Sequence, residues 1–222
     1  MTFPFQGVVF DVDGTLLESM SIWKQVDHIF LEKRNIKVPS SLDHNICGLS
    51  FTETAAHFQN VFQLPQSVEE IKDEFRDIAS SLYSDVGLKP GVLQFIQLLR
   101  DLNVPLGIAT STDRKILDKT LLKLDIAHYF SATKTSCEVP KGKPSPDVFL
   151  AAARDLNVDP SLCLAFEDSV QGAVSAREAG MKVFAIRDNH AIKNENELKV
   201  ISDGHYFNDW HEVLIHFEEF FN

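Results

Sequence analysis

Short hydrophobic runs alternate with amphipathic segments along most of this 222-residue chain. The run at 7–10 is apolar and rich in β-branched residues, which predicts a buried strand. Similar runs further along predict strands at 105–110, 130–133, 162–166, 182–186 and 205–207. Segments with helical spacing predict helices at 91–102, 114–124, 147–156, 170–179 and from 209 onward. Because each return to a parallel strand needs a crossover helix, this alternation predicts a parallel sheet covered on both faces.

Residues 17–86 follow a different pattern. Apolar side chains such as Ile22 and Val26 recur there at helical spacing, and no strand is predicted. The expected fold is therefore α/β, with a three-layer, Rossmann-like parallel sheet core formed by 1–16 and 87–222 and an inserted all-helical cap domain. Ligands of open parallel sheets bind beyond the carboxyl ends of the strands, so we expect the cap to close over a site there.

The composition is typical of a globular protein, with 44% hydrophobic and 24% charged residues. The chain reaches Asp11 too early for a secretory signal peptide, and no later apolar run is long enough to span a membrane. Cys47, Cys137 and Cys163 lack CxxC spacing, which argues against a disulfide framework and a zinc site. We therefore expect a cytoplasmic protein that is not bound to a membrane.

The formal net charge of -11 limits the partners of this chain. Nucleic acid is disfavoured, because its phosphates require a basic track and the 21 Lys and Arg residues are scattered. An anionic small-molecule substrate must be attracted locally, by a metal ion or a few placed cations. The apolar face of the last helix, with Val213, Leu214 and Phe217, is explained by core packing, so a monomer is expected and a dimer is the alternative.

Acidic side chains follow the first predicted strand. Asp11 and Asp13 are two residues apart, so both carboxylates can point to one site, and Gly14 allows the backbone to turn. A calcium-binding loop is excluded, since Leu16 and Ile22 stand where that loop needs a glycine and a glutamate. On its own the DxDGT pattern has an equally good explanation as an ordinary structural loop.

Three other strand ends or loops carry residues suited to phosphate chemistry. The second strand of the alternating half ends at Thr110 and Ser111, hydroxyls beside free amides at a helix start, although such residues are also common helix caps. Lys143 lies in a loop that two prolines stiffen, as a fixed charge on a phosphate requires, although most loop lysines are simply solvated. Glu167 and Asp168 follow another buried strand, where adjacent acids more often coordinate a cation.

These motifs, in this order, resemble the haloacid dehalogenase superfamily of phosphohydrolases, in the branch with a helical cap between the first and second motifs. The resemblance spans nearly the whole chain. Its most specific parts are the segments KGKPSPDVF and FEDSVQGAVSAREAGM, whereas DxDGT alone is weak. The chain is similar to β-phosphoglucomutase-like sugar phosphatases of that branch.

The resemblance implies a role for each motif residue. Asp11 is the nucleophile that forms an aspartyl-phosphate, and Asp13 is the general acid and base. Thr110, Ser111 and Lys143 bind the phosphate. The cofactor implied is Mg²⁺, and its implied ligands are Asp11, Asp13 through its backbone carbonyl, Asp168 and Glu167, the last directly or through water.

Two other activities of the superfamily fit this sequence less well. Dehalogenases resemble the site but lack an acid at the position of Asp13. A β-phosphoglucomutase-like enzyme grips a second phosphate with a cap histidine and a cap arginine, where this chain has Trp23 and Phe51. Because apolar side chains do not offset the charge of a bisphosphate, we expect hydrolysis of a small phosphomonoester, a sugar or polyol phosphate, and keep the mutase as the alternative.

The cap residues Trp23, Gly48 and Phe51 are candidate substrate-specificity positions. Aromatic residues of cap helices pack in a core more often than they touch substrate, so both interpretations stay open. Arg34 or Lys72 could replace the missing cap cations, which keeps the mutase alternative open. A further alternative is a catalytically silent phosphate-binding relative, against which the intact nucleophile motif argues.

Overall fold

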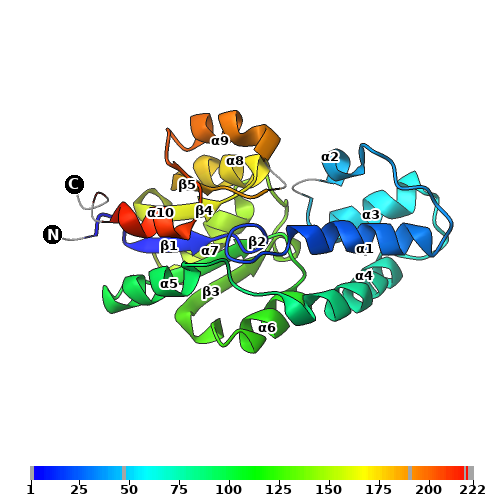
Figure 1. The fold of residues 1–222 in the computed structure, drawn as a ribbon, viewed down its shortest axis with the longest axis horizontal. Coiled ribbons are helices and arrows are strands. Elements are labelled where there is room, and N and C mark those ends of the chain that lie inside the picture. Colours follow the sequence, from blue (N-terminus) through cyan, green and yellow to red (C-terminus); the bar gives the residue numbers. More distant parts are fainter. Residues whose placement is uncertain (1–2, 47–48, 190–191, 218, 220–222) are drawn as a thin grey trace.

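The computed structural model describes residues 3–46, 49–189, 192–217 and 219. Within them the chain forms a six-stranded, all-parallel sheet in the order β3-β2-β1-β4-β5-β6 (Figure 1). The strands are β1 (Gly7–Phe10), β2 (Leu106–Thr110), β3 (Phe130–Thr135), β4 (Cys163–Glu167), β5 (Lys182–Ile186) and β6 (Tyr206–Phe207). Each of the later five strands overlaps the range predicted from its hydrophobic run, and the predicted α/β fold class is confirmed.

The two faces of the sheet are covered by different helices, because alternate strand residues point to opposite sides. Val8 and Phe10 pack with one set of helices, whereas Val9 packs with the other. The first set is α5 (Val92–Asp101), α6 (Arg114–Lys123) and α10 (Trp210–Ile215). The second set is α7 (Asp147–Leu156), α8 (Val170–Glu178) and α9 (Glu195–Ile201). The sequence pattern does not predict α9, a seven-residue helix rich in charge in which only Leu198 is buried.

The segment between β1 and α5 is helical, as its periodicity predicts. It contains α1 (Met20–Glu32), α2 (Leu42–Ile46), α3 (Phe51–Val61) and α4 (Val68–Leu82), followed by the short 3-10 helix η1 (Tyr83–Asp85). These helices, which we call the helical insertion, extend from one side of the core (Figure 1). Their centre is aromatic: the Phe75 ring lies 4.7 Å from that of Phe30 and 5.1 Å from that of Phe58.

The order of the strands places the site-bearing loop at a topological switch point. The chain runs from β1 to β2 and β3 on one side, and later returns to β4 on the other side of β1. In open parallel sheets the crevice beyond the carboxyl ends of such strands is where ligands bind. Asp11 follows β1 directly and Glu167 ends β4, so the switch point brings these two carboxylates together.

The last helix supports the loop that follows β1. Trp210, fully buried on α10, donates a hydrogen bond from Nε1 to the backbone oxygen of Thr15 over 3.0 Å. Val213 and Phe217 are also buried, and Leu214 packs against the same core, which agrees with the interpretation of this face as core. In the described part of the chain, no helix has the length and apolar character needed to cross a bilayer.

Candidate active site

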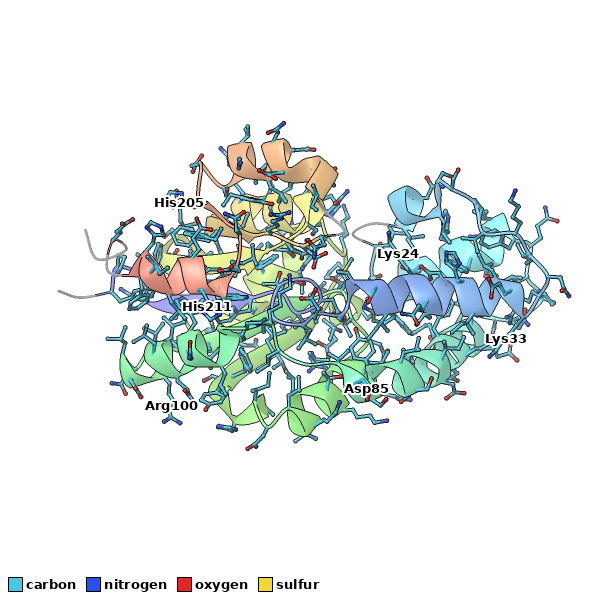
Figure 2. All side chains as sticks on the ribbon, in the orientation of Figure 1. Lys24, Lys33, Asp85, Arg100, His205 and His211 are labelled. Carbon is cyan, nitrogen blue, oxygen red and sulfur yellow. The ribbon has the colours of Figure 1, made fainter. Side chains whose placement is uncertain are left out.

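The predicted site residues lie around one cavity of about 230 Å³, between the carboxyl ends of the strands and the helical insertion. Nine of them line it: Asp11, Asp13, Trp23, Phe51, Thr110, Ser111, Lys143, Glu167 and Asp168. The tenth, Gly48, lies outside the described residues. Figure 2 labels Lys24, another residue of the cavity wall, at the end of α1 nearest the sheet, and Lys33 at the far end. The cavity therefore lies where the insertion meets the core.

A buried ion cluster forms the floor of the cavity. The Nζ atom of Lys143 lies 2.6 Å from Oδ1 of Asp11 and 2.5 Å from Oε1 of Glu167, and all three side chains are buried. The Lys143 ammonium also lies 5.2 Å from the centre of the Phe149 ring. Lys143 is thus a fixed charge rather than a solvated one, which is the less common outcome for a loop lysine.

The protonation equilibria of this cluster are strongly perturbed. Burial raises the pKa of Asp11 to about 8, although the charge of Lys143 opposes this effect. Burial, reinforced by the neighbouring Glu167 carboxylate, also raises the pKa of Asp168 well above its ordinary value. Burial alone lowers the pKa of Lys143, but the carboxylates of Asp11 and Glu167 outweigh it and raise that pKa. The site thus holds more negative charge than one ammonium neutralises.

Glu167 is held by donors on both of its oxygens. Its Oε2 accepts hydrogen bonds from the backbone amides of Asp168 and Ser169, each at 2.9 Å, and from the Ser169 hydroxyl at 3.0 Å. Its Oε1 accepts from Lys143. The side chain packs against Gly172 of α8, where an added Cβ atom would lie 1.8 Å from Oε1. Only glycine leaves room for Glu167 at this place in the helix.

Asp11, Glu167 and Asp168 can together present ligand oxygens to one metal ion. One oxygen from each carboxylate lies within 4.8 Å of the other two. Thr15 donates to Oδ1 of Asp168 at 3.2 Å, and among the described residues no donor reaches Oδ2 of Asp168 or Oδ2 of Asp11. Carboxylate oxygens are the donors that Mg²⁺ prefers, so this set fits the implied cofactor.

The Asp13 carboxylate accepts hydrogen bonds from three hydroxyl groups. Ser19 Oγ donates to its Oδ1 at 2.5 Å, the Tyr83 hydroxyl donates to the same oxygen, and Thr112 Oγ1 donates to Oδ2. Ser19, Tyr83 and Thr112 are not among the site residues predicted from the sequence. Thr112 lies two residues after the predicted Thr110, so the sequence could have indicated it. No local pattern indicates Tyr83, which is 70 residues from Asp13.

The predicted phosphate-binding hydroxyls lie at the end of β2. Thr110 is buried and accepts a hydrogen bond at its Oγ1 from the backbone amide of Thr112 at 3.2 Å. The hydroxyl of Ser111 lies 3.3 Å from that of Ser136. Both residues line the same cavity as the ion cluster, and their role toward phosphate stays a prediction.

The wall that the helical insertion contributes is largely apolar. Phe51 is buried and Trp23 half-buried, with ring centres 6.0 Å apart, so each packs in the insertion and also lines the cavity. The packing agrees with the interpretation of these aromatic residues as core, and their contact with substrate stays a prediction. Arg34 pairs with Glu74, Lys72 pairs with Glu69, and neither is in the wall; the cation found there is Lys24. The expectation that Arg34 or Lys72 could supply a cap cation is not supported, because their salt bridges direct them elsewhere.

The model of the protein family described as "Haloacid dehalogenase-like hydrolase" matches residues 8–186 of this chain. The chain belongs to this family. Its glycine-packed Glu167 and its lysine-bridged Asp11 lie within the matched region, and the predicted family and phosphatase class are confirmed.

Several curated members of this hydrolase family are similar to the chain. It is 33% identical over 190 residues to (DL)-glycerol-3-phosphatase 2 of Arabidopsis thaliana, covering 82% of this chain and 79% of that protein. It is 26% identical over 216 residues to the phosphorylated carbohydrates phosphatase of Thermotoga maritima, covering 94% and 100%. It is also 33% identical over 180 residues to the bifunctional riboflavin kinase/FMN phosphatase of Arabidopsis thaliana, covering 81% of this chain but only 48% of that longer protein.

Solved structures of the family share the fold. A hydrolase from Pseudomonas syringae superposes with a TM-score of 0.82 at 22% identity, covering 97% of this chain and 99% of that one. The β-phosphoglucomutase of Clostridium difficile superposes with a TM-score of 0.81 at 18% identity, covering 98% and 97%. The TM-scores establish the shared architecture, and identities this low do not distinguish a phosphatase from a mutase.

The packing of Gly172 against Glu167 leads to a stability prediction with an unusual sign. Glycine to alanine inside a helix ordinarily stabilises by roughly 1 kcal/mol. We expect Gly172→Ala to destabilise the protein by about 1–3 kcal/mol in urea unfolding, because the new methyl group displaces the Glu167 carboxylate. The matched control is Gly87→Ala, whose added methyl group meets no atom within 4 Å and should change stability by less than about 0.5 kcal/mol. A stabilised Gly172→Ala variant would contradict this packing.

Proposed function

We propose that this protein is a magnesium-dependent phosphomonoester hydrolase that works through an aspartyl-phosphate on Asp11. The observation that carries the proposal is the buried bridge of Lys143 between Asp11 and Glu167, beside Asp168. In this proposal Asp11 is the nucleophile, Lys143 the fixed cation and Asp168 a metal ligand, and the support is that all three side chains line one cavity. Phosphoryl transfer depends mainly on such positioning and on stabilisation of spreading charge.

The proposed reaction has two displacements. A carboxylate oxygen of Asp11 attacks phosphorus, and the bond from phosphorus to the leaving oxygen breaks as Asp13 gives that oxygen its proton. Asp13 then takes a proton from water, whose oxygen attacks phosphorus and breaks the bond to Asp11, releasing inorganic phosphate. Lys143 and the hydroxyls of Thr110 and Ser111 hold the transferring oxygens in this scheme.

Asp11 and Asp168 are the proposed direct metal ligands, together with the backbone carbonyl of Asp13. Each of the two side chains has an oxygen that no described residue reaches with a hydrogen bond, whereas both oxygens of Glu167 already have donors. Glu167 therefore acts mainly by fixing Lys143 and adding charge. Bound Mg²⁺ neutralises the repulsion between the Asp11 carboxylate and an incoming phosphate dianion.

The proposed substrate is a small sugar or polyol phosphate. Among the relatives, a glycerol-3-phosphatase, a phosphorylated carbohydrates phosphatase and a hexitol phosphatase carry such substrates in their names. The cavity of about 230 Å³ suits a molecule of that size.

We further propose that residues 17–86 act as a cap domain over a core of 1–16 and 87–222, and that the enzyme is a cytoplasmic monomer.

The central role of Asp11 is tested by replacing it with an amide. We expect Asp11→Asn to fold normally and to lose at least about a thousand-fold in turnover of glycerol phosphate with Mg²⁺, because an amide cannot form the acyl phosphate. Phosphate release from purified protein is the measurement. The control is Asp125→Asn, an exposed residue whose loss should leave the rate unchanged. Turnover near the wild-type rate in Asp11→Asn would overturn the proposed mechanism.

The remaining alternative, a sugar phosphomutase, requires the site to hold a bisphosphate and turn it around. The wall of the insertion presents Trp23 and Phe51 there, and its cation Lys24 is already engaged within the protein. Because the described part of this wall offers no free positive charge to the second phosphate, a bisphosphate intermediate should dissociate, or its aspartyl-phosphate precursor should be hydrolysed.

Product analysis separates hydrolase from mutase. With glucose 1-phosphate, a trace of the 1,6-bisphosphate and Mg²⁺, we expect release of inorganic phosphate to exceed formation of glucose 6-phosphate by about ten-fold or more, because the wall lacks a second phosphate grip. Both products are quantified in the same reaction. Glucose 6-phosphate formed faster than phosphate would favour the mutase.

A further inference from the structure

The Asp13 carboxylate is held by hydroxyls from three separate segments of the chain. Ser19 lies just before α1, Thr112 lies in the loop after β2, and Tyr83 begins η1 directly after α4. All three donate to Asp13, and Asp13 itself lines the cavity. Two of the three donors, Ser19 and Tyr83, lie at the two ends of the helical insertion, before α1 and after α4.

The distribution of these donors differs between the two oxygens of Asp13. Oδ1 accepts from both Ser19 and Tyr83, which uses its two lone pairs, whereas Oδ2 accepts from Thr112 alone. Oδ2 thus keeps a lone pair that none of these hydroxyls uses. The Tyr83 hydroxyl restricts rotation of the Asp13 carboxylate, and Tyr83 is not among the residues that line the cavity.

Contacts of α4 and of Tyr83 with the core accompany the hydrogen bond from Tyr83 to Asp13. Arg76 of α4 forms an ion pair with the buried Asp113, whose Oδ1 lies 3.1 Å from Nε of the arginine. Lys123 of α6 donates a hydrogen bond to the backbone oxygen of Tyr83 at 3.3 Å. The Tyr83 ring also packs edge-on against Trp23 of α1, with centres 5.7 Å apart. The position of this hydroxyl thus depends on the docking of the insertion.

We propose that Tyr83 is a positioning residue for Asp13, which makes protonation of the leaving oxygen depend on the docked helical insertion. This inference rests on the proposed function and adds a residue to it. In the first displacement the phosphorus–oxygen bond to the leaving group breaks and the proton of Asp13 moves to that oxygen. When Tyr83 is absent, Oδ1 has one donor fewer and the carboxyl group can rotate, so the proton is misdirected. The displacement by Asp11 is otherwise unaffected.

The test compares two leaving groups in Tyr83→Phe. Glycerol phosphate needs a proton on its alkoxide, whereas p-nitrophenyl phosphate releases a stable phenolate that needs little help. We expect kcat/KM to fall about ten-fold or more for glycerol phosphate and less than about three-fold for p-nitrophenyl phosphate, with the thermal midpoint recorded for each variant. Tyr129→Phe is the control, because the Tyr129 hydroxyl contacts Gln97 at 3.4 Å, away from the cavity, and both substrates should keep their wild-type rates.

A second variant guards against a folding defect in Tyr83→Phe. Thr112→Val removes the donor to Oδ2 from the core side, and Thr112→Ser keeps it, so the valine variant should show the same selective loss and the serine variant should not. Equal losses for both substrates in Tyr83→Phe, or no loss, would overturn the positioning role while leaving the phosphatase intact. A wild-type protein that hydrolyses neither substrate would overturn the proposed function itself, and this inference with it.

Discussion

The placement of Lys143 between two buried carboxylates is the interaction on which the rest of the site depends. Asp11, Glu167 and Asp168 bring three acidic groups into a space with one ammonium, and burying an unpaired charge costs several kcal/mol. Backbone amides and hydroxyls on Glu167 offset part of that cost. Protons or a bound divalent cation would offset the remainder, and in the proposed function the cation would also reduce the repulsion that a chain of net charge -11 exerts on a phosphate.

Other parts of the fold serve to hold these charges in place. Gly172 leaves room for Glu167 in α8, and Gly14, at a φ of +85°, leaves room for Asp168, whose Oδ2 would lie 2.2 Å from an added Cβ atom. Trp210 ties the loop after β1 to the last helix. Lys89 and Asp188 form a further buried ion pair, and the charge of Asp188 reaches Asp168. The residues that pack around the site, such as Gly14 and Gly172, therefore also determine where its carboxylates lie.

The parts of this architecture that were predicted from the sequence are those that short-range pattern controls. Buried parallel strands are continuous apolar runs, so β1 to β6 could be located, and the acids and lysine at their ends could be assigned to one edge of the sheet. The helix α9 was not predicted because it is only seven residues long, three of them charged, and only Leu198 is buried. The contacts of Tyr83 and Trp210 were not predicted for another reason. Their partners Asp13 and Thr15 lie 70 and 195 residues away in the sequence, and only the three-dimensional fold brings them together.

The excess of buried negative charge is tested most directly by the pH dependence of magnesium stabilisation. The pKa of Asp11 is raised to about 8, so its protonation stabilises the metal-free fold at low pH, and this contribution is lost as pH rises from about 4 toward 8. As a ligand of Mg²⁺, Asp11 would have to be deprotonated. The rise in thermal midpoint that about 10 mM MgCl₂ produces, relative to NaCl of equal ionic strength, should therefore grow from little at pH 5.5 to several degrees at pH 8. A rise that is equal at both pH values, or no rise at either, would contradict a carboxylate cluster that needs a divalent cation.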